Sequence, residues 1–411
     1  MTFDELYRNM LKSAVTGAPI DLNLDEINPH QLDCLLHPET CAPVLRAGDC
    51  ACQGKTPDCA AACLFGAIRR EADGNVIIDP SLCAGCSSCV EACKSGALTA
   101  SHDVLPALAA VKNAKGPVYA LIAPAFHGQF AADVTPGKLR SAFKALGFQG
   151  MVEVALFADV LTLKEALEFD HNIRTEEDYQ LTSCCCPMWI AMLKKVYQEL
   201  MPHVPGAVSP MVAAGRTIKR LHPDAVTIFV GPCIAKKAEA REPDLAGAVD
   251  YVLTFQEVRD IFSAADIHPE TLEDVERDHS SRAGRIYARA GGVSEAVQAT
   301  VNRLNPNRDI RIRTRQAAGI PACRAMIEAI RAGERDANFF EGMGCVGGCV
   351  GGPKAILDRE TGRGNVERYG EQAEYGTPLD NPYVLEMLRQ LGFDTVEDFL
   401  ANSDIFNRAL S

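Results

Sequence analysis

The sequence lacks the features of a membrane protein, a secreted protein and a nucleic-acid-binding protein. No run approaches the ~20 uninterrupted apolar residues that a bilayer-spanning helix needs, and the charged segment 1–17 has no apolar core of a secretory signal. Lysine and arginine (41) are outnumbered by aspartate and glutamate (54), so the net charge is −13. This charge disfavours nucleic acid or an anionic membrane as a partner. These absences predict a cytoplasmic protein. Outside the cysteine-rich segment 341–352, whose glycines happen to have G-x-G-x-x-G spacing, no dinucleotide-binding fingerprint is evident. This argues against direct use of NAD(P)H or a flavin.

Cysteine, in contrast, is abundant. The 411 residues include 17 cysteines, ten of them between Cys34 and Cys93. Cytosolic thiols are kept reduced, so a disulfide framework is not expected. Closely spaced thiols in a reducing compartment instead indicate metal ligands. The length favours two or three domains.

Residues 80–96 carry cysteines with the spacing C-x2-C-x2-C-x3-C, and an irregular copy with the spacing C-x-C-x6-C-x3-C precedes them. Both copies end in Cys-x2-Gly-Ala, which marks an internal repeat. The segment resembles a two-cluster [4Fe–4S] ferredoxin domain, in which the fourth cysteine of each copy binds the other cluster. The resemblance implies one cluster on Cys83, Cys86, Cys89 and Cys63. It implies a second cluster on Cys50, Cys52, Cys59 and Cys93.

Two alternatives remain open in this region. Four thiolates also suit a structural zinc site, although two interleaved copies favour iron–sulfur clusters. Cys34 and Cys41 lie upstream and could replace a ligand of the irregular copy. The preferred interpretation is that neither binds metal.

From about residue 115 onward, apolar runs alternate with helical patterns. The runs 118–123, 152–157, 225–230 and 251–255 predict buried strands, and the patterns at 161–169 and 187–200 predict helices. The alternation predicts an α/β fold with mostly parallel sheets. Ligands of such sheets bind at the carboxyl ends of the strands. One cysteine segment directly follows the third run, and another opens a helix with Pro187 in its first turn.

Three of the remaining segments match a known set of motifs in order. They read TSCCCPMW (182–189), GPCIAKKAE (231–239) and EGMGCVGGCVGG (341–352). They resemble the active-site motifs of [FeFe]-hydrogenases, which interconvert protons and electrons with molecular hydrogen. Weaker matches are Ala123–Ala125 and Gly291–Ala296. Behind a ferredoxin-like domain, the resemblance implies a large hydrogenase-like catalytic domain with mostly parallel sheets.

The resemblance implies the family's H-cluster, a [4Fe–4S] cube joined through a cysteine sulfur to a diiron unit. That unit carries carbon monoxide, cyanide and a bridging azadithiolate. The matching cube ligands are Cys186, Cys233, Cys345 and Cys349, with Cys349 as the bridge. Glycines at 342, 344, 347, 348 and 351 fit a loop that approaches the cofactor closely.

Residues that surround the diiron unit follow from the same resemblance. Lys236 matches a donor to cyanide, and Met343 matches a methionine of the apolar wall. The other residues predicted to line the cofactor are Ala123, Pro124 and Pro232. Lys237 is expected to be a solvated helix residue, whereas Glu239 is either part of a proton path or a structural partner of the site.

Proton delivery to a buried site needs a titratable chain, and a thiol has a suitable pKa of about 8.5. In the family, the cysteine before the cube ligand of the first motif is the relay. An extra cysteine leaves two registers open here. Anchoring on Pro187 makes Cys185 the relay, which is the preferred assignment, whereas anchoring on Thr182 makes Cys184 the relay.

The outer relay of relatives runs glutamate, serine, glutamate. Glu165 and Glu168 match the two glutamates, at a spacing that places them on one helix face. The serine has no counterpart, because Pro205 occupies its place and Ser209 follows four residues later. The third motif also lacks the family's usual Gly-Gly-Gly-Gln-Pro tail. These departures indicate a divergent branch. Cys323 has no partner motif and is expected to be a small buried residue.

The predicted organisation has four parts: an N-terminal helical extension (1–40), the ferredoxin-like domain (41–105), the H-cluster domain (115–375) and a small-subunit-like C-terminal segment (376–411). The leading hypothesis is a hydrogenase that exchanges electrons with ferredoxin or a similar one-electron carrier. Maturation proteins would deliver its diiron unit. The alternatives are a hydrogenase-like iron–sulfur assembly protein and a hydrogen or redox sensor.

Overall fold

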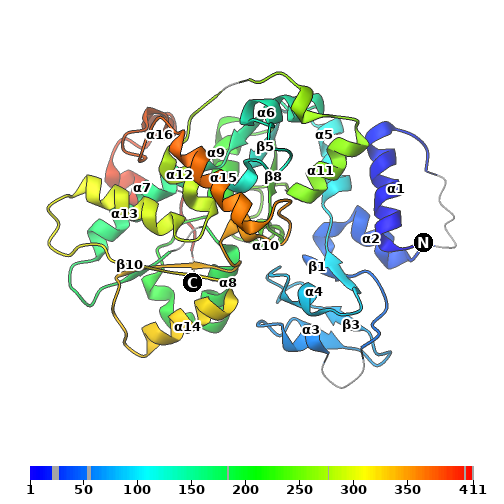
Figure 1. Ribbon diagram of the computed structural model, residues 1–411, viewed down its shortest axis with the longest axis horizontal. Coiled ribbons are helices and arrows are strands. Elements are labelled where there is room, and N and C mark those ends of the chain that lie inside the picture. The colour runs from blue at the N-terminus through cyan, green and yellow to red at the C-terminus, as the bar shows by residue number, and fades with distance from the viewer. Residues whose placement is uncertain (21–26, 53–56, 183–184, 276, 402–403, 410–411) are drawn as a thin grey trace.

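The computed structural model describes residues 1–411 except 21–26, 53–56, 183–184, 276, 402–403 and 410–411. Figure 1 shows two neighbouring parts: the N-terminal helices with the cysteine-rich segment, and a larger α/β part that contains the remaining strands. Cys184, the alternative relay, lies outside the described residues. The predicted α/β class is confirmed, because both sheets of the larger part are parallel.

The N-terminal helices are α1 (Phe3–Thr16) and α2 (Pro29–Leu36). Helix α1 begins at a capping box formed by Thr2 and Glu5 and ends at Gly17 in the left-handed conformation. Its buried face, which includes Phe3, Leu6 and Leu11, belongs to the core of the larger part. Helix α1 therefore packs on the large domain as well as on α2.

The cysteine-rich segment forms a small domain of short elements. They are β1 (Val44–Arg46), α3 (Asp58–Ala61), β2 (Ile68–Arg70), β3 (Val76–Ile78), α4 (Ser88–Ala92) and β4 (Leu98–Ala100). Strand β1 pairs with β4 and β2 with β3, both antiparallel. The internal repeat is visible in the structure, because each copy supplies one short helix, and α3 packs on α4.

The larger part contains a four-stranded parallel sheet in the order β6-β5-β8-β9. The strands are β5 (Val118–Ile122), β6 (Gly150–Glu153), β8 (Val226–Gly231) and β9 (Tyr251–Thr254). Three of the four predicted strands are confirmed to within one or two residues. The predicted strand at 152–157 is wrong beyond Glu153, because α7 begins at Ala155. Its residues are buried on nearly every side, so no apolar–polar period marked the change.

A second parallel sheet has the order β10-β11-β7. Its strands are β7 (Gln180–Leu181), β10 (Thr314–Ala318) and β11 (Phe339–Met343). Strand β11 is buried along its whole length, which fixes the backbone that leads into the third motif. The sequence analysis did not identify these strands, because β7 is very short and β10 carries polar residues.

The helices of the larger part surround these sheets (Figure 1). They are α5 (Val104–Asn113), α6 (Pro136–Ala145), α7 (Ala155–Asn172), α8 (Pro187–Val196), α9 (Pro210–Leu221), α10 (Ala235–Ala240), α11 (Phe255–Ala264), α12 (Arg282–Arg285), α13 (Gly292–Leu304), α14 (Ile320–Arg331), α15 (Arg359–Glu371), α16 (Pro382–Gln390) and α17 (Val396–Ala401). Within the described ranges, no helix combines the length and apolarity that crossing a bilayer requires.

Helix α8 begins at Pro187 as predicted but ends earlier than the apolar pattern indicated. Tyr197 leaves the helical conformation, and the chain continues as a 3₁₀ helix from Gln198 to His203 that contains Pro202. The α-helix expected over 187–200 is therefore wrong beyond Val196.

Candidate functional site: a buried thiol cluster beside a ferredoxin-like domain

The candidate site lies where loops leave the carboxyl ends of strands from both parallel sheets. Strand β5 leads into Ala123 and Pro124, and β8 leads into Pro232 and Cys233. In the second sheet, β11 leads into Gly344 and Cys345, and β7 leads toward Cys185 and Cys186. Parallel strands expose their carboxyl ends at one edge, so four loops that are distant in sequence meet there.

The predicted cube thiols come together in this region. Cys345 and Cys349 both have Cys233 and Cys186 as electrostatic neighbours. Burial raises the pKa of Cys233 to about 11 and that of Cys349 to about 12, and it also raises the pKa of Cys345. These thiols stay protonated even though the charge of Lys236 lowers the pKa of Cys233 and of Cys349. A thiolate cluster here therefore requires the positive charge of bound metal.

Contacts around Trp189 join the first motif to the third. The indole Nε1 donates to the carbonyl oxygen of Thr182 (3.0 Å), and the ring covers Gly342, where a Cβ atom would lie 2.1 Å from it. The Gly344 amide donates to Sγ of Cys186 at 3.3 Å. This contact places Cys186 beside the loop that bears Cys345, which supports the register anchored on Pro187.

Met343 and Gly348 bring the third-motif loop against the segment before α13. A Cβ atom on Gly348, whose φ is +86°, would lie 2.6 Å from the Ala290 amide nitrogen and 2.7 Å from Sδ of Met343. Met343 is 1% exposed. The thioether predicted for the wall of the diiron unit therefore packs directly beside the backbone that precedes Cys349. Only glycine tolerates both this close approach and this conformation.

Sequence reasoning missed the role of Glu341. Its side chain is fully buried, and its carboxylate accepts hydrogen bonds from the Gly291 and Ser294 amides (2.8 and 2.7 Å) at the start of α13. The N-terminus of a helix favours a negative charge. The pair Gly291-Gly292 at the start of a helix was a usable signal, because it marks a place where backbone amides can approach an acceptor closely.

Lys236 and Glu239 form a buried ion pair on α10, with 2.7 Å between Nζ and Oε2. Burial lowers the pKa of Lys236, but the Glu239 carboxylate outweighs this effect and leaves that pKa above its ordinary value. The ammonium therefore stays charged close to Cys233 and Cys349, its other electrostatic neighbours. Glu239 is accordingly a structural partner of the site lysine, one of the two roles considered for it.

The expectation that Lys237 is solvated is wrong. Its side chain is fully buried, and its Nζ lies 3.2 Å from Oε1 of Glu257 and 3.4 Å from Oδ1 of Asp103. Helix α10 is short and covered on both sides, so adjacent residues face different buried partners. His102 completes this network through a 2.9 Å contact with Glu257.

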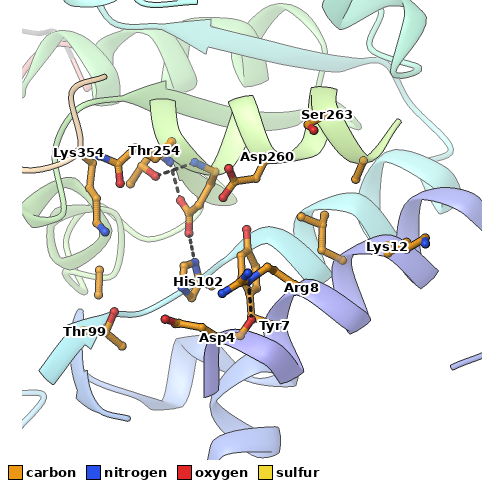
Figure 2. A pocket seen from close by; sticks show the side chains of 15 residues that line it. Asp4, Tyr7, Arg8, Lys12, Thr99, His102, Thr254, Asp260, Ser263 and Lys354 are labelled. Carbon is orange, nitrogen blue, oxygen red and sulfur yellow. Dashed lines mark hydrogen bonds and ion pairs between the residues drawn. The ribbon is translucent and has the colours of Figure 1, made fainter. Parts of the chain in front are cut away.

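The same network borders a cavity of about 720 Å³ that lies between α1 and α11. Figure 2 shows Tyr7 and Arg8 of α1 facing Asp260 and Ser263 of α11, with His102 between them. The residues that line this cavity include none of the cysteines. It is therefore separate from the thiol site.

The predicted proton-path residues are Cys185, Glu165 and Glu168. Burial is the main cause of the raised pKa of the Cys185 thiol. Nearby negative groups raise this pKa further, and they belong to Cys186, Glu341, Cys349 and Glu165. Glu165 is fully buried on α7, so it is not a surface carboxylate. Cys185 and Glu165 are thus electrostatic neighbours, as a relay between them requires.

Glu168 also lies on α7, where its carboxylate pairs with Lys164. Burial raises the pKa of Glu168, although the charge of Lys164 partly offsets this effect. Pro205, which occupies the place of the family's serine, lines a separate cavity of about 340 Å³ with His203 and Gln180. The Ser209 hydroxyl instead caps α9 by accepting from the Val212 amide.

The cysteines of the small domain gather into the two predicted sets. Cys83 and Cys89 both have Cys86 and Cys63 as electrostatic neighbours. In the other set, the neighbours of Cys59 include Cys93, Cys52 and Cys50. The fourth cysteine of each copy therefore lies with the first three cysteines of the other copy.

The first of these sets lies against the thiol site. A Cβ atom on Gly85, whose φ is +69°, would lie 2.9 Å from the Ala235 Cα at the start of α10. Glu91 of α4 is an electrostatic neighbour of Cys345. Ala84 and Cys86 also belong to the apolar cluster that contains Trp189 and Cys186. The small domain and the site are thus in van der Waals contact.

The chemistry of the donors fits iron–sulfur cofactors. The thiol site and the two cysteine sets of the small domain all consist of thiols, the ligands that hold [4Fe–4S] cubes. The Ala67 amide donates to Sγ of Cys63 at 3.3 Å, as backbone amides around such clusters do. Within the part of the chain that the structure describes, no three Cys, His, Asp or Glu side chains are placed to hold a single metal ion.

Comparison with protein families agrees with this geometry. Residues 116–353 match the family described as iron only hydrogenase large subunit, C-terminal domain. Residues 76–99 match the 4Fe-4S binding domain. The second match includes the regular cysteine run, so it favours iron–sulfur clusters over the zinc alternative.

Two curated proteins illustrate the range of relatives. Iron hydrogenase 1 of Clostridium pasteurianum is 28% identical over 275 residues, which are 57% of this chain and 48% of that protein. The match thus spans about half the length of that relative. The cytosolic Fe-S cluster assembly factor NAR1 of Kluyveromyces lactis is 30% identical over 82 residues, 20% of this chain and 18% of that protein.

Among solved structures, an [FeFe]-hydrogenase studied for stepwise H-cluster assembly superposes with a TM-score of 0.61. The superposition covers 74% of this chain and 97% of that chain at 21% identity. At that level of identity the likeness establishes the fold. The roles of individual residues rest on the contacts described above.

Proposed function

We propose that this chain, which belongs to the iron-only hydrogenase large-subunit family, is a hydrogenase that interconverts protons and electrons with molecular hydrogen. The observation that carries the proposal is the convergence of Cys186, Cys233, Cys345 and Cys349 beside a buried, charged Lys236. When bound, an H-cluster supplies the redox-active metal at which hydrogen is made or split.

The residues of this chain hold that cofactor and exclude water from it. The four thiols would hold the cube, and Cys349 occupies the position that matches the family's bridging cysteine. Lys236, held by Glu239, presents a charged donor suited to an anionic cyanide ligand. Met343, Ala123 and Pro124 form apolar walls, and Met343 and Ala123 are almost completely buried. Pro232 leads from β8 to Cys233 and completes this lining.

Protons travel through Cys185 toward Glu165. The Cys185 thiol is surrounded by buried groups that keep it protonated, so it presents a proton at the site. Glu165 and Glu168 share a face of α7 and continue the route outward. Since Pro205 cannot relay a proton, the step between the two glutamates uses water or another side chain.

The small domain would supply the route for electrons. Its two thiol sets would hold [4Fe–4S] clusters, and the set that includes Cys83 and Cys86 adjoins the catalytic site at Gly85 and Ala235. Because the small domain packs directly on the large domain, clusters in it would lie close to the catalytic site. The external donor or acceptor is ferredoxin or a similar one-electron carrier, and maturation proteins deliver the diiron unit.

The test is hydrogen production by protein whose clusters are reconstituted and whose diiron unit is then supplied. With a strong one-electron reductant, gas chromatography should detect hydrogen. Cys349→Ser, which removes the bridge, should abolish this hydrogen production. Absence of hydrogen from protein that holds the complete cofactor would overturn the proposal.

The second candidate is an iron–sulfur assembly protein of the kind named in the match to NAR1. A protein of that kind keeps the cube cysteines and needs no diiron unit. Lys236, Met343 and Cys185 favour the enzyme, because they match residues that surround the family's diiron unit and would have no such role in a protein without it. A sensor with the same cofactor would be distinguished by slow turnover.

A further inference from the structure

We propose that Cys34 and Cys41 form a redox-active dithiol that closes reversibly to a disulfide by exchange with a low-molecular-weight disulfide of the glutathione class. Cys34 lies on α2, and Cys41 follows the 3₁₀ turn Pro38–Thr40. Their Sγ atoms are 2.9 Å apart. A disulfide bond is about 2.05 Å long, so a small movement closes it.

Neither thiol joins the iron–sulfur sets. Cys59 has Cys50, Cys52 and Cys93 as its thiol neighbours, so the irregular copy supplies its ligands without help from upstream. The thiol neighbour of Cys34 is Cys41, and the thiol neighbour of Cys41 is Cys34. The geometry thus assigns these two cysteines to each other, which favours the interpretation without a ligand role.

The two thiols differ in the way that disulfide exchange requires. Cys34 is 1% exposed and packs in the core shared by α1, α2 and α5. Cys41 is half-buried and lines a cleft of about 410 Å³ with Arg241, Lys194 and Pro187. Cys41 is therefore the thiol that an incoming disulfide can reach, and Cys34 is the resolving thiol behind it.

The electrostatic surroundings support the same division. The hydrogen bond shared with Cys34 lowers the pKa of Cys41, and Arg241 acts in the same direction. That hydrogen bond and burial raise the pKa of Cys34. The thiolate is the attacking species in exchange, so Cys41 reacts first.

The chemistry balances in two steps. The Cys41 thiolate attacks one sulfur of the oxidant, forms a mixed disulfide and releases one thiolate. Cys34 then loses its proton and attacks the Cys41 sulfur, which forms the protein disulfide and releases the second thiol. The oxidant gains the two electrons that the protein thiols lose. Excess reduced glutathione reverses both steps.

A hydrogen bond joins the Cys34–Cys41 pair to the end of α10, a helix of the catalytic site. The Cys41 carbonyl oxygen accepts from Nη1 of Arg241 (3.0 Å), which caps the end of α10. Nη2 of Arg241 donates to Oδ1 of Asp103 at 2.9 Å. Helix α10 carries Lys236, so a hydrogen bond links the backbone of the dithiol segment to the helix that bears the site lysine.

Trypsin offers a clean readout, because residues 13–46 contain Cys34, Cys41 and no internal lysine or arginine. Cluster-loaded protein is equilibrated anaerobically in buffers of increasing oxidised-to-reduced glutathione ratio and quenched in acid. Free thiols then take a light maleimide label. After reduction, the remaining cysteines take a heavy label, and mass spectrometry follows the peptide 13–46.

The expected result is a single transition from two light labels to two heavy labels, reversed by reduced glutathione. Cys41→Ser should leave Cys34 light throughout, whereas Cys34→Ser should trap glutathione on Cys41. Both variants should keep the wild-type iron content. Two light labels at every ratio, a glutathione adduct without ring closure in the wild type, or iron loss in either variant would overturn the proposal.

Discussion

At the scale of single residues, the site depends on which cysteine of the first motif binds the cube. The Gly344 amide donates to Cys186, and Cys185 lies among Glu341, Cys349 and Glu165. Cys185→Ala should therefore lower hydrogen production by about 10²-fold or more, a typical loss for a proton-transfer group, without loss of iron.

The matched control is Cys323→Ala. Cys323 is a buried thiol whose Sγ donates to the Met343 carbonyl oxygen at 3.3 Å, and it lies on α14 outside the proton route. That variant should keep most of the activity. Loss of iron from Cys185→Ala would show that Cys185 is a cube ligand, and the register would then have to shift to Cys184.

The buried pair of Lys236 and Glu239 gives a second residue-scale prediction. Lys236→Met removes the donor for an anionic ligand, so the diiron unit should bind weakly while the cubes remain loaded. Glu239→Gln keeps a hydrogen-bond acceptor for Lys236 and should retain the diiron unit. Iron analysis separates the two variants. Equal diiron content in both would contradict the role given to Lys236.

At the scale of elements, α10 joins the site to the rest of the large domain. Lys237→Met leaves the Glu257 carboxylate buried without its lysine, and this should lower the free energy of unfolding by about 3 kcal/mol. Lys144→Met, on the exposed end of α6, should change it by less than about 0.5 kcal/mol. Denaturant titration measures both.

Glu257 adds a pH dependence to the same contact. Burial raises the pKa of Glu257, but Lys237 and His102 outweigh burial and hold it at about 2, below its ordinary 4.5. A depressed carboxyl pKa stabilises the fold above pH 4.5 and loses that effect as the pH falls toward 2. The stability difference between wild type and Glu257→Gln should therefore shrink over this window. A constant difference would contradict the assignment.

The elements also show what the sequence could predict. Strands β5, β8 and β9 were predictable because each is a short apolar run bounded by turn residues. The start of α7 at Ala155 was not, since a helix buried on all sides has the same composition as a buried strand. Lys237 was misjudged for a related reason: on a short buried helix, a lysine beside a site residue meets buried carboxylates instead of solvent.

At the scale of the whole molecule, the proposed function requires a path for electrons from the small domain to the large domain. Cys86→Ser should lower the iron content by about four atoms per chain, one [4Fe–4S] cluster. It should slow reduction by ferredoxin more than reduction by a small dye that reaches the site directly. Cys41→Ser is the matched control and should retain all iron. An unchanged ferredoxin rate in Cys86→Ser would remove this cluster from the path.

The positions of the ligand thiols were predictable to the extent that motifs fix them. Spacing placed Cys83, Cys86, Cys89 and Cys63 together, and the structure gathers the same thiols. Contacts between motifs could not be predicted from the sequence. Glu341, for example, contacts the start of α13, which lies 47–50 residues away along the chain. The Cys34–Cys41 pair was likewise visible only once α2 and the following turn had been placed.

The central claim is that the buried thiol site holds a diiron unit as well as a cube. Infrared spectroscopy of the matured protein tests it most directly, because iron-bound carbon monoxide and cyanide absorb where polypeptide does not. The account predicts bands from both ligands, which disappear in Cys349→Ser. Protein with fully loaded cubes and no such bands after maturation would contradict the claim and favour the assembly function.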